Sequence, residues 1–231
     1  MRLNVVRGGV RGAVPIVFLH GLGSSAATWS QCLELLADTF DVAAVDLLGH
    51  GGSPVPDDPD EYTRDRALAD LDDVLADLFG PADGSHRPVL VGHSLGGYLA
   101  LAHAITRPGV DRGLVVLNTG PGFRDPDKRE AWNERSRRNA HKFGVAPQVT
   151  DLNLHRDALV MDRIAELTVP VLVLVGDRDR PEYQASGAWF ERRLPDGRVR
   201  LVEGGEHSMH EATHADVVAA MIREFVLGLT S

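Results

Sequence analysis

The chain has 231 residues, of which 43% are hydrophobic and 25% charged, and this composition is typical of a globular protein rather than a disordered one. Its net charge of −9 argues against a nucleic-acid partner, because phosphate backbones are bound by clustered Lys and Arg. No run approaches the roughly 18 apolar residues of a membrane helix, and the single cysteine, Cys32, excludes an intramolecular disulfide. We therefore expect a cytoplasmic protein with no membrane partner.

Short apolar runs without polar alternation recur along the chain and are typical of strands buried on both faces of a sheet. A run of alternating character at 198–202 predicts an outer strand, and 3–6 predicts an antiparallel edge strand. The buried strands are predicted at 16–19, 42–45, 89–91, 114–117 and 171–175.

Amphipathic segments separate these runs. Two of them begin at good capping residues, since Ser24 and Ser25 precede the first and Thr63 precedes the second. Helices are predicted at 26–37, 64–78, 95–105, 183–194 and 215–227. Strands that alternate with helices indicate an α/β fold built on a mostly parallel sheet, as a single domain over 1–231.

The segment 122–168 interrupts this alternation, because one short crossover helix would suffice between the strands on either side. It is too small for a core of its own, so we expect a helical cap or lid folded over one end of the sheet. Its apolar residues Phe123, Trp132 and Met161 could line a substrate site, although core packing would explain them equally well.

The strongest chemical signal is Gly92-His93-Ser94-Leu95-Gly96, which follows a predicted strand and precedes a predicted helix. A serine on so tight a turn needs strained backbone angles, and the flanking glycines remove Cβ atoms that would collide. The pattern predicts that Ser94 is a nucleophile exposed above the sheet.

A second motif, His20-Gly21-Leu22-Gly23, directly follows the strand predicted at 16–19. Backbone N–H groups of Leu22 and Leu95 could together form an oxyanion hole, which stabilises a tetrahedral intermediate. A purely structural turn would account for this motif equally well.

These two motifs, together with Asp46-Leu47-Leu48-Gly49-His50-Gly51-Gly52-Ser53 between them, resemble the α/β-hydrolase superfamily in order and spacing. The resemblance covers nearly the whole chain. It implies an α/β-hydrolase fold with a mostly parallel sheet of seven or eight strands flanked by helices, and a site at the carboxyl ends of the strands.

The resemblance also implies that an acid and then a histidine follow the nucleophile along the chain. The strand predicted at 171–175 leads into Gly176-Asp177-Arg178-Asp179, where the family pattern selects Asp179 and leaves Asp177 as its competitor. The histidine after the last strand is His207, which would act as the general base. His210 and His214 are expected to face solvent.

The activity that follows from the resemblance is hydrolysis of a small or medium carboxylic ester, lactone or thioester through an acyl-enzyme on Ser94. A C–C bond hydrolase or a biosynthetic lactone or thioester enzyme with the same triad is the alternative, and a non-catalytic binding protein on the same scaffold is another. We expect a small-molecule substrate, no nucleotide cofactor and no metal, because no matching motif occurs. The oligomeric state is not specified by the sequence.

Overall fold

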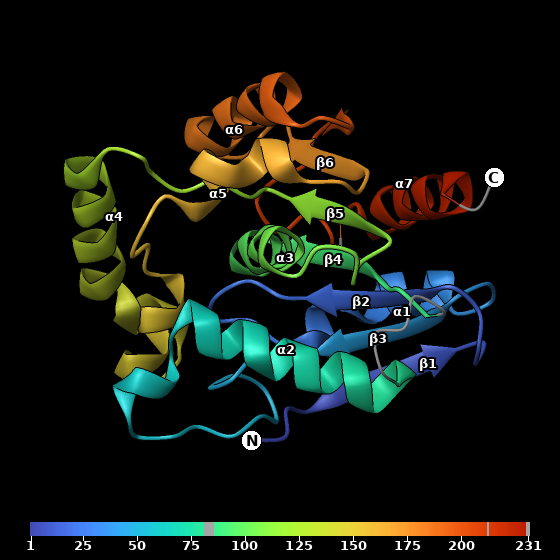
Figure 1. Ribbon diagram of the computed structural model, residues 1–231, viewed down its shortest axis with the longest axis horizontal. Coiled ribbons are helices and arrows are strands. Elements are labelled where there is room, and N and C mark those ends of the chain that lie inside the picture. Colours follow the sequence, from blue (N-terminus) through green and yellow to red (C-terminus); the bar gives the residue numbers. More distant parts are fainter. Residues whose placement is uncertain (81–85, 212, 230–231) are drawn as a thin grey trace.

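A computed structural model describes residues 1–80, 86–211 and 213–229 of the chain. At its centre is a seven-stranded sheet in the order β1-β3-β2-β4-β5-β6-β7 (Figure 1). Only β1 runs antiparallel, and it occupies an edge as its sequence predicts. The strands are β1 (Val5–Gly9), β2 (Pro15–Leu19), β3 (Asp41–Val45), β4 (Val89–His93), β5 (Gly113–Leu117), β6 (Val171–Gly176) and β7 (Gly197–Val202).

The predicted helices are all present, with ends shifted by a few residues. The α-helices are α1 (Ser30–Leu36), α2 (Arg64–Phe79), α3 (Leu95–Thr106), α4 (Pro126–Arg138), α5 (Leu159–Arg163), α6 (Pro181–Arg193) and α7 (Ala215–Gly228). Short 3₁₀ helices are η1 (Ala26–Trp29), η2 (Pro59–Glu61), η3 (Ala140–Phe143), η4 (Pro147–Asn153) and η5 (Ile164–Glu166). None of the helices in the described residues is long and apolar enough to cross a membrane.

The core has two layers, one on each face of the sheet, and alternate residues of a strand belong to different layers. In β2, Val17 and Leu19 join the layer formed with α2, α3 and α6. Ile16 and Phe18 join the layer formed with α1 and α7. The strand is buried on both faces, which explains why its sequence is apolar without alternation.

Helix capping agrees with the sequence prediction at one site and differs at another. Thr63 caps α2 as predicted, because its hydroxyl accepts the Arg66 N–H at 3.2 Å. The prediction for Ser25 was wrong, because its side chain makes no capping bond to η1. The carboxylate of Asp46 accepts the Ala26 N–H at 2.6 Å instead. A capping group supplied by a residue 20 positions away leaves no local sequence signal.

The 122–168 segment contains α4, η3, η4, α5 and η5 between β5 and β6. In Figure 1 the arrowheads of β2, β3 and β5 point toward α4, so the segment lies beyond the carboxyl ends of the strands. Its longest helix, α4, buries only Asn133 and Ser136. The side-chain amide of Asn133 makes two hydrogen bonds to the backbone of His155, both at 2.9 Å. Its oxygen accepts a bond from the His155 N–H, and its nitrogen donates one to the His155 carbonyl.

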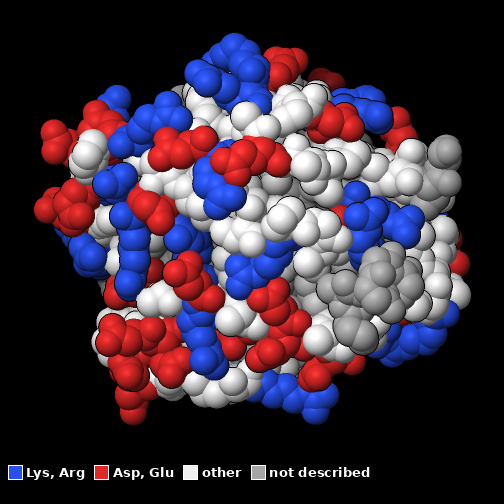
Figure 2. Space-filling view, in the orientation of Figure 1, with Lys and Arg blue, Asp and Glu red and all other residues white. Residues whose placement is uncertain are grey.

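The surface in this orientation carries mixed charge. Figure 2 shows acidic and basic side chains interspersed over much of the visible face, with no continuous basic area among the described residues.

Candidate active site

Ser94 lies on a sharp turn between β4 and α3, and its backbone has φ 51° and ψ −111°. A non-glycine residue rarely adopts a positive φ, so the turn is strained. Packing explains the flanking glycines: a Cβ on Gly92 would lie 2.3 Å from the Gly96 carbonyl oxygen, and one on Gly96 would lie 2.2 Å from that of Leu19. The Ser94 N–H donates to the Leu117 carbonyl at 2.9 Å, which anchors the turn to β5.

The loop that carries Leu22 is held by two buried histidines. His20 Nε2 accepts the Leu47 N–H at 3.0 Å, and His50 Nε2 accepts the Gly23 N–H at 3.1 Å. Each ring donates through Nδ1 to a backbone carbonyl. The motif around His50 therefore positions the loop after β2, and Leu22 and Leu95 both border the cavity beside Ser94.

These acceptor roles require neutral imidazoles. Burial lowers the pKa of His20 to about 4, with the neighbouring His50 adding to the effect. Burial also lowers the pKa of His50. A neutral ring offers one donor and one acceptor nitrogen, which is the pattern both residues use.

The loops after β6 and β7 bring Asp179 and His207 together. His207 Nδ1 donates to Asp179 Oδ2 at 2.8 Å, and the Asp179 side chain is only 1% exposed. Asp177 lies elsewhere, since its carboxylate accepts the Gly204 N–H at 2.7 Å and the residue is exposed. The structure thus places Asp179, and not Asp177, against the imidazole.

Asn118 is a residue that the sequence analysis did not identify. It follows β5 with φ 47°, a conformation that Asn tolerates better than most residues. Its amide donates to the carbonyls of Glu206 and His207 at 3.0 and 2.8 Å and accepts the Gly176 N–H at 2.9 Å. Asn118 therefore ties the end of β6 to the His207 loop. The only feature of the sequence that could have pointed to this role is the presence of an Asn directly after a predicted strand.

His210 corrects another prediction, because it is fully buried instead of solvent-facing. Its ring packs between Trp29 and His93, with centroid distances of 4.1 and 4.4 Å, and neither ring nitrogen has a hydrogen-bond partner among the described residues. Burial lowers its pKa to about 3. His93 in turn donates from Nε2 to the His207 carbonyl at 2.8 Å and packs against that imidazole.

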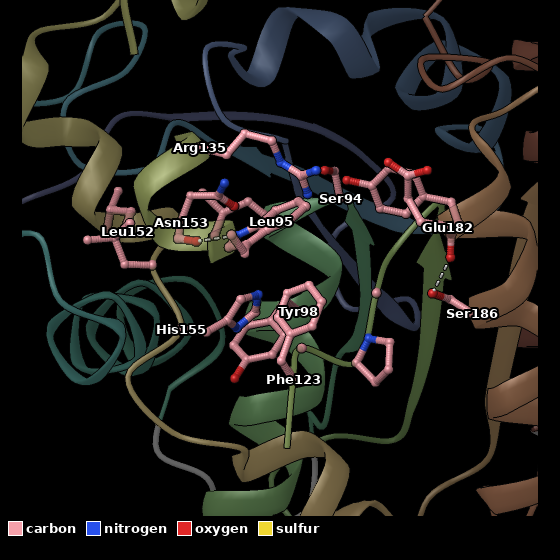
Figure 3. A pocket seen from close by; sticks show the side chains of 16 residues that line it. Ser94, Leu95, Tyr98, Phe123, Arg135, Leu152, Asn153, His155, Glu182 and Ser186 are labelled. Atoms are coloured by element: carbon pink, nitrogen blue, oxygen red, sulfur yellow. Dashed lines mark hydrogen bonds between the residues drawn. The ribbon is translucent and has the colours of Figure 1, made fainter. Parts of the chain in front are cut away.

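Ser94 borders two adjoining cavities, an apolar chamber, whose lining is drawn in Figure 3, and a polar chamber. The apolar chamber has a volume of about 340 Å³ and includes Leu95, Tyr98 and Phe123 in its lining. The polar chamber has a volume of about 600 Å³ and includes Leu22 and His207. The residues shared by both are Ser94, Trp132, Arg135, Asn153 and Tyr183. Phe123 and Trp132 thus line the cavity as anticipated, whereas Met161 does not.

Two arginines face this cavity, and both were missed by the sequence analysis. The Arg135 side chain extends toward Ser94 in Figure 3 and packs over Trp132, 5.0 Å from the ring centroid. Arg180 packs over Tyr183 at 4.8 Å. Within the described part of the chain, neither guanidinium pairs with a carboxylate. Their positions could not be found without knowing how α4 and α6 fold over the sheet.

A search of the described residues finds no group of three or more His, Cys, Asp or Glu side chains arranged to hold a metal ion.

The parallel sheet, the strained serine turn and the Asp–His pair define the α/β-hydrolase class, and comparison with known proteins agrees. The chain belongs to the alpha/beta hydrolase family, whose model matches residues 16–221. A provisional 2-succinyl-6-hydroxy-2,4-cyclohexadiene-1-carboxylate synthase of Bacillus subtilis is 25% identical over 91% of this chain and 89% of that protein. Vertebrate epoxide hydrolases match at 31–32% identity, over 51% of this chain and about a third of their own length.

Solved structures show the same fold at lower identity. MenH from Staphylococcus aureus aligns over the whole of both chains with a TM-score of 0.84 and 20% identity. A thermophilic esterase from Thermogutta terrifontis aligns over 99% of this chain and 94% of its own, with a TM-score of 0.77 and 23% identity.

Proposed function

We propose that the protein is a serine hydrolase that cleaves a small or medium carboxylic ester, lactone or thioester. The observation that carries the proposal is that His207, which borders the same cavity as Ser94 on its strained turn, is hydrogen-bonded to the buried carboxylate of Asp179. Among the relatives, the epoxide hydrolases suggest another reaction, but the resemblance associates that chemistry with an aspartate at the position where this chain has Ser94.

In the proposed reaction, Ser94 Oγ attacks the substrate carbonyl while His207 Nε2 takes the hydroxyl proton. Asp179 accepts a hydrogen bond from Nδ1, which fixes the tautomer and stabilises the imidazolium. The N–H groups of Leu22 and Leu95 stabilise the oxyanion. His207 returns the proton to the leaving group, and a water molecule then hydrolyses the acyl-enzyme by the same sequence of steps.

The two chambers suggest where each half of the substrate lies. His207 borders the polar chamber, so the leaving group that it protonates departs through that side. The acyl group then occupies the apolar chamber, whose 340 Å³ is near the lower limit for ligand cavities and suits a small or medium acyl group. The 122–168 segment supplies Phe123 and Trp132 to this chamber and would act as its lid.

The test is the Ser94→Ala variant, assayed with a panel of 4-nitrophenyl esters of increasing acyl length. We expect kcat to fall by about 10⁴-fold or more, with a thermal midpoint near that of the wild type. Ser30→Ala is the control, because Ser30 is exposed on α1 outside the cavity. Turnover by Ser94→Ala equal to that of the wild type would reject the proposal.

A biosynthetic reaction with the same triad is the second candidate, favoured by Arg135 and Arg180. Two guanidinium groups that have no carboxylate partner among the described residues border the cavity of the proposed nucleophile, and they suit a substrate that carries carboxylates. The relative from Bacillus subtilis is named for a carboxylate product. Arg135→Gln should raise KM about tenfold for dicarboxylic monoesters and leave KM for neutral esters unchanged. An equal effect on both substrates would exclude carboxylate recognition by Arg135.

A further inference from the structure

Tyr183 lines both chambers together with Ser94 but has no role in the mechanism above. It lies in the first turn of α6, where its N–H donates to the Arg180 carbonyl at 2.9 Å. Only 8% of the residue is exposed, and the Ser94 side chain acts to lower the pKa of its hydroxyl, against the raising effect of burial. The phenol therefore lies close to the serine whose oxygen would form the acyl bond.

The ring of Tyr183 packs on His207, with centroids 4.6 Å apart and planes inclined by 37°. This contact places the phenol on the imidazole side of Ser94. A leaving-group oxygen must lie within reach of the imidazole that protonates it. Tyr183, which borders both chambers, therefore lines the space that this oxygen would occupy.

The phenol stays neutral at this position. Burial raises its pKa above the usual value, against an opposing effect of the Arg180 guanidinium over its ring. A neutral phenol is a hydrogen-bond donor, and a serine hydroxyl can accept that bond while its own proton remains available for His207.

We propose that Tyr183 is a catalytic residue that donates a hydrogen bond to the leaving-group oxygen during acylation. This inference rests on the proposed acyl-enzyme reaction and adds to it a donor separate from the oxyanion hole.

The step balances without any further reactant. The Ser94 Oγ–carbon bond forms, and the Ser94 proton moves to His207. Once Oγ becomes an ester oxygen, its electron pair is shared with the acyl carbonyl and it accepts hydrogen bonds poorly. The Tyr183 hydroxyl is then free to stabilise the leaving oxygen as its bond to carbon breaks. His207 delivers the proton to that oxygen, and Tyr183 keeps its own.

The test compares Tyr183→Phe on two esters of one acid, an alkyl ester and a 4-nitrophenyl ester, by kcat/KM, which reports acylation. An alkoxide needs a donor as it leaves, whereas 4-nitrophenolate is stable without one. A hydrogen bond to a developing charge implies a loss of about 10- to 100-fold for the alkyl ester. We expect a loss below about threefold for the 4-nitrophenyl ester.

Tyr62→Phe is the matched control. The hydroxyl of the buried Tyr62 donates a hydrogen bond to the Pro56 carbonyl at 2.8 Å, outside the cavity. Any change in kcat/KM caused by Tyr62→Phe should therefore be equal for both esters. Equal losses for the two esters in Tyr183→Phe, or no loss, would overturn the inference while leaving the acyl-enzyme proposal intact. Loss of turnover in Ser94→Ala tests that proposal separately. If the Phe variant does not fold, Tyr183→Met repeats the comparison.

Discussion

The carboxyl ends of β4, β5 and β6 and the 122–168 segment face each other across the cavity but are built differently. Every residue of these three strands is buried, so their ends are fixed by the core. The helix α4 buries only two residues, both polar, and rests on a few hydrogen bonds. The difference indicates that the groups assigned to the proposed reaction are held by the whole fold, whereas α4, beside the proposed substrate site, contributes little to the core. The rest of the segment is anchored, because Val149 and Val160 are fully buried in the core.

Asn118, at the end of β5, and Asn133, in α4, allow these two regions to be compared directly. Asn118 and Asn133 are both buried, and each makes paired hydrogen bonds to backbone groups far along the chain. Asn118 fixes the loop of His207, and Asn133 fixes the loop of His155, which lines the apolar chamber. The same kind of side-chain amide therefore supports the strand ends in one case and the 122–168 segment in the other.

Between these two amides, the larger expected effect is that of Asn118→Ala on kcat. Loss of its three bonds would let the His207 loop shift, and a displacement of about 1 Å can cost about 100-fold in rate. Asn133→Ala should leave kcat for an acetyl ester within about threefold and instead raise KM for longer acyl chains. Steady-state kinetics on both variants provide the measurement. If both variants lost kcat equally, the two regions would not be distinct.

A smaller effect is expected on the stability of the protein at low pH. This stability should depend on two buried histidines, His20 and His210, which follow strands of the sheet. His20 and His210 have pKa values lowered to about 4 and about 3, below the unfolded value of about 6.5. Below about pH 6.5 these two histidines are protonated in the unfolded chain but remain neutral in the folded chain. The free energy of unfolding therefore falls as the pH drops below about 6.5. By pH 5 each such histidine costs about 2 kcal/mol.

His210→Phe tests this linkage, because the ring makes no hydrogen bond within the described part of the chain. The variant should be about 2 kcal/mol more stable at pH 5, relative to wild type, than it is at pH 7. Urea unfolding at both pH values measures the difference. His141→Phe is the control, because His141 is exposed in η3 and should not change the pH dependence. A His210→Phe variant with the acid sensitivity of the wild type would contradict the account.

The smallest effect is expected from the 122–168 segment. Trp132→Ala removes a side chain that borders both chambers and supports Arg135. We expect KM for a hexanoyl ester to rise about three- to tenfold through lost apolar contact, with kcat for an acetyl ester nearly unchanged. A matched fall in kcat for both esters would instead place Trp132 in the reaction itself.

The sequence was most informative where the chain buries both faces of a strand. The run at 171–175 predicted β6, because a local pattern carries that information, and the family resemblance then selected Asp179 at its exit, with Asp177 as the competitor. Asn118, whose partner His207 is 89 positions away, leaves no such pattern.

His210 was misjudged for a related reason. Its immediate neighbours, Met209 and Glu211, differ in polarity and give no clear signal of burial. The ring is buried because Trp29 and His93, from other parts of the fold, pack against it. Tyr183 was missed because its importance depends on where α6 directs it. Residues that act through distant partners could not be found from spacing alone.

The central claim is that Asp179 and His207 make Ser94 a nucleophile, and covalent labelling with a fluorophosphonate tests it most directly. Peptide mapping should locate one label per chain, on Ser94. The labelling rate should fall by more than about 100-fold in Asp179→Asn and stay near the wild-type rate in Asp177→Asn. Absence of a label, a label on another serine, or a slow rate in Asp177→Asn alone would contradict the account.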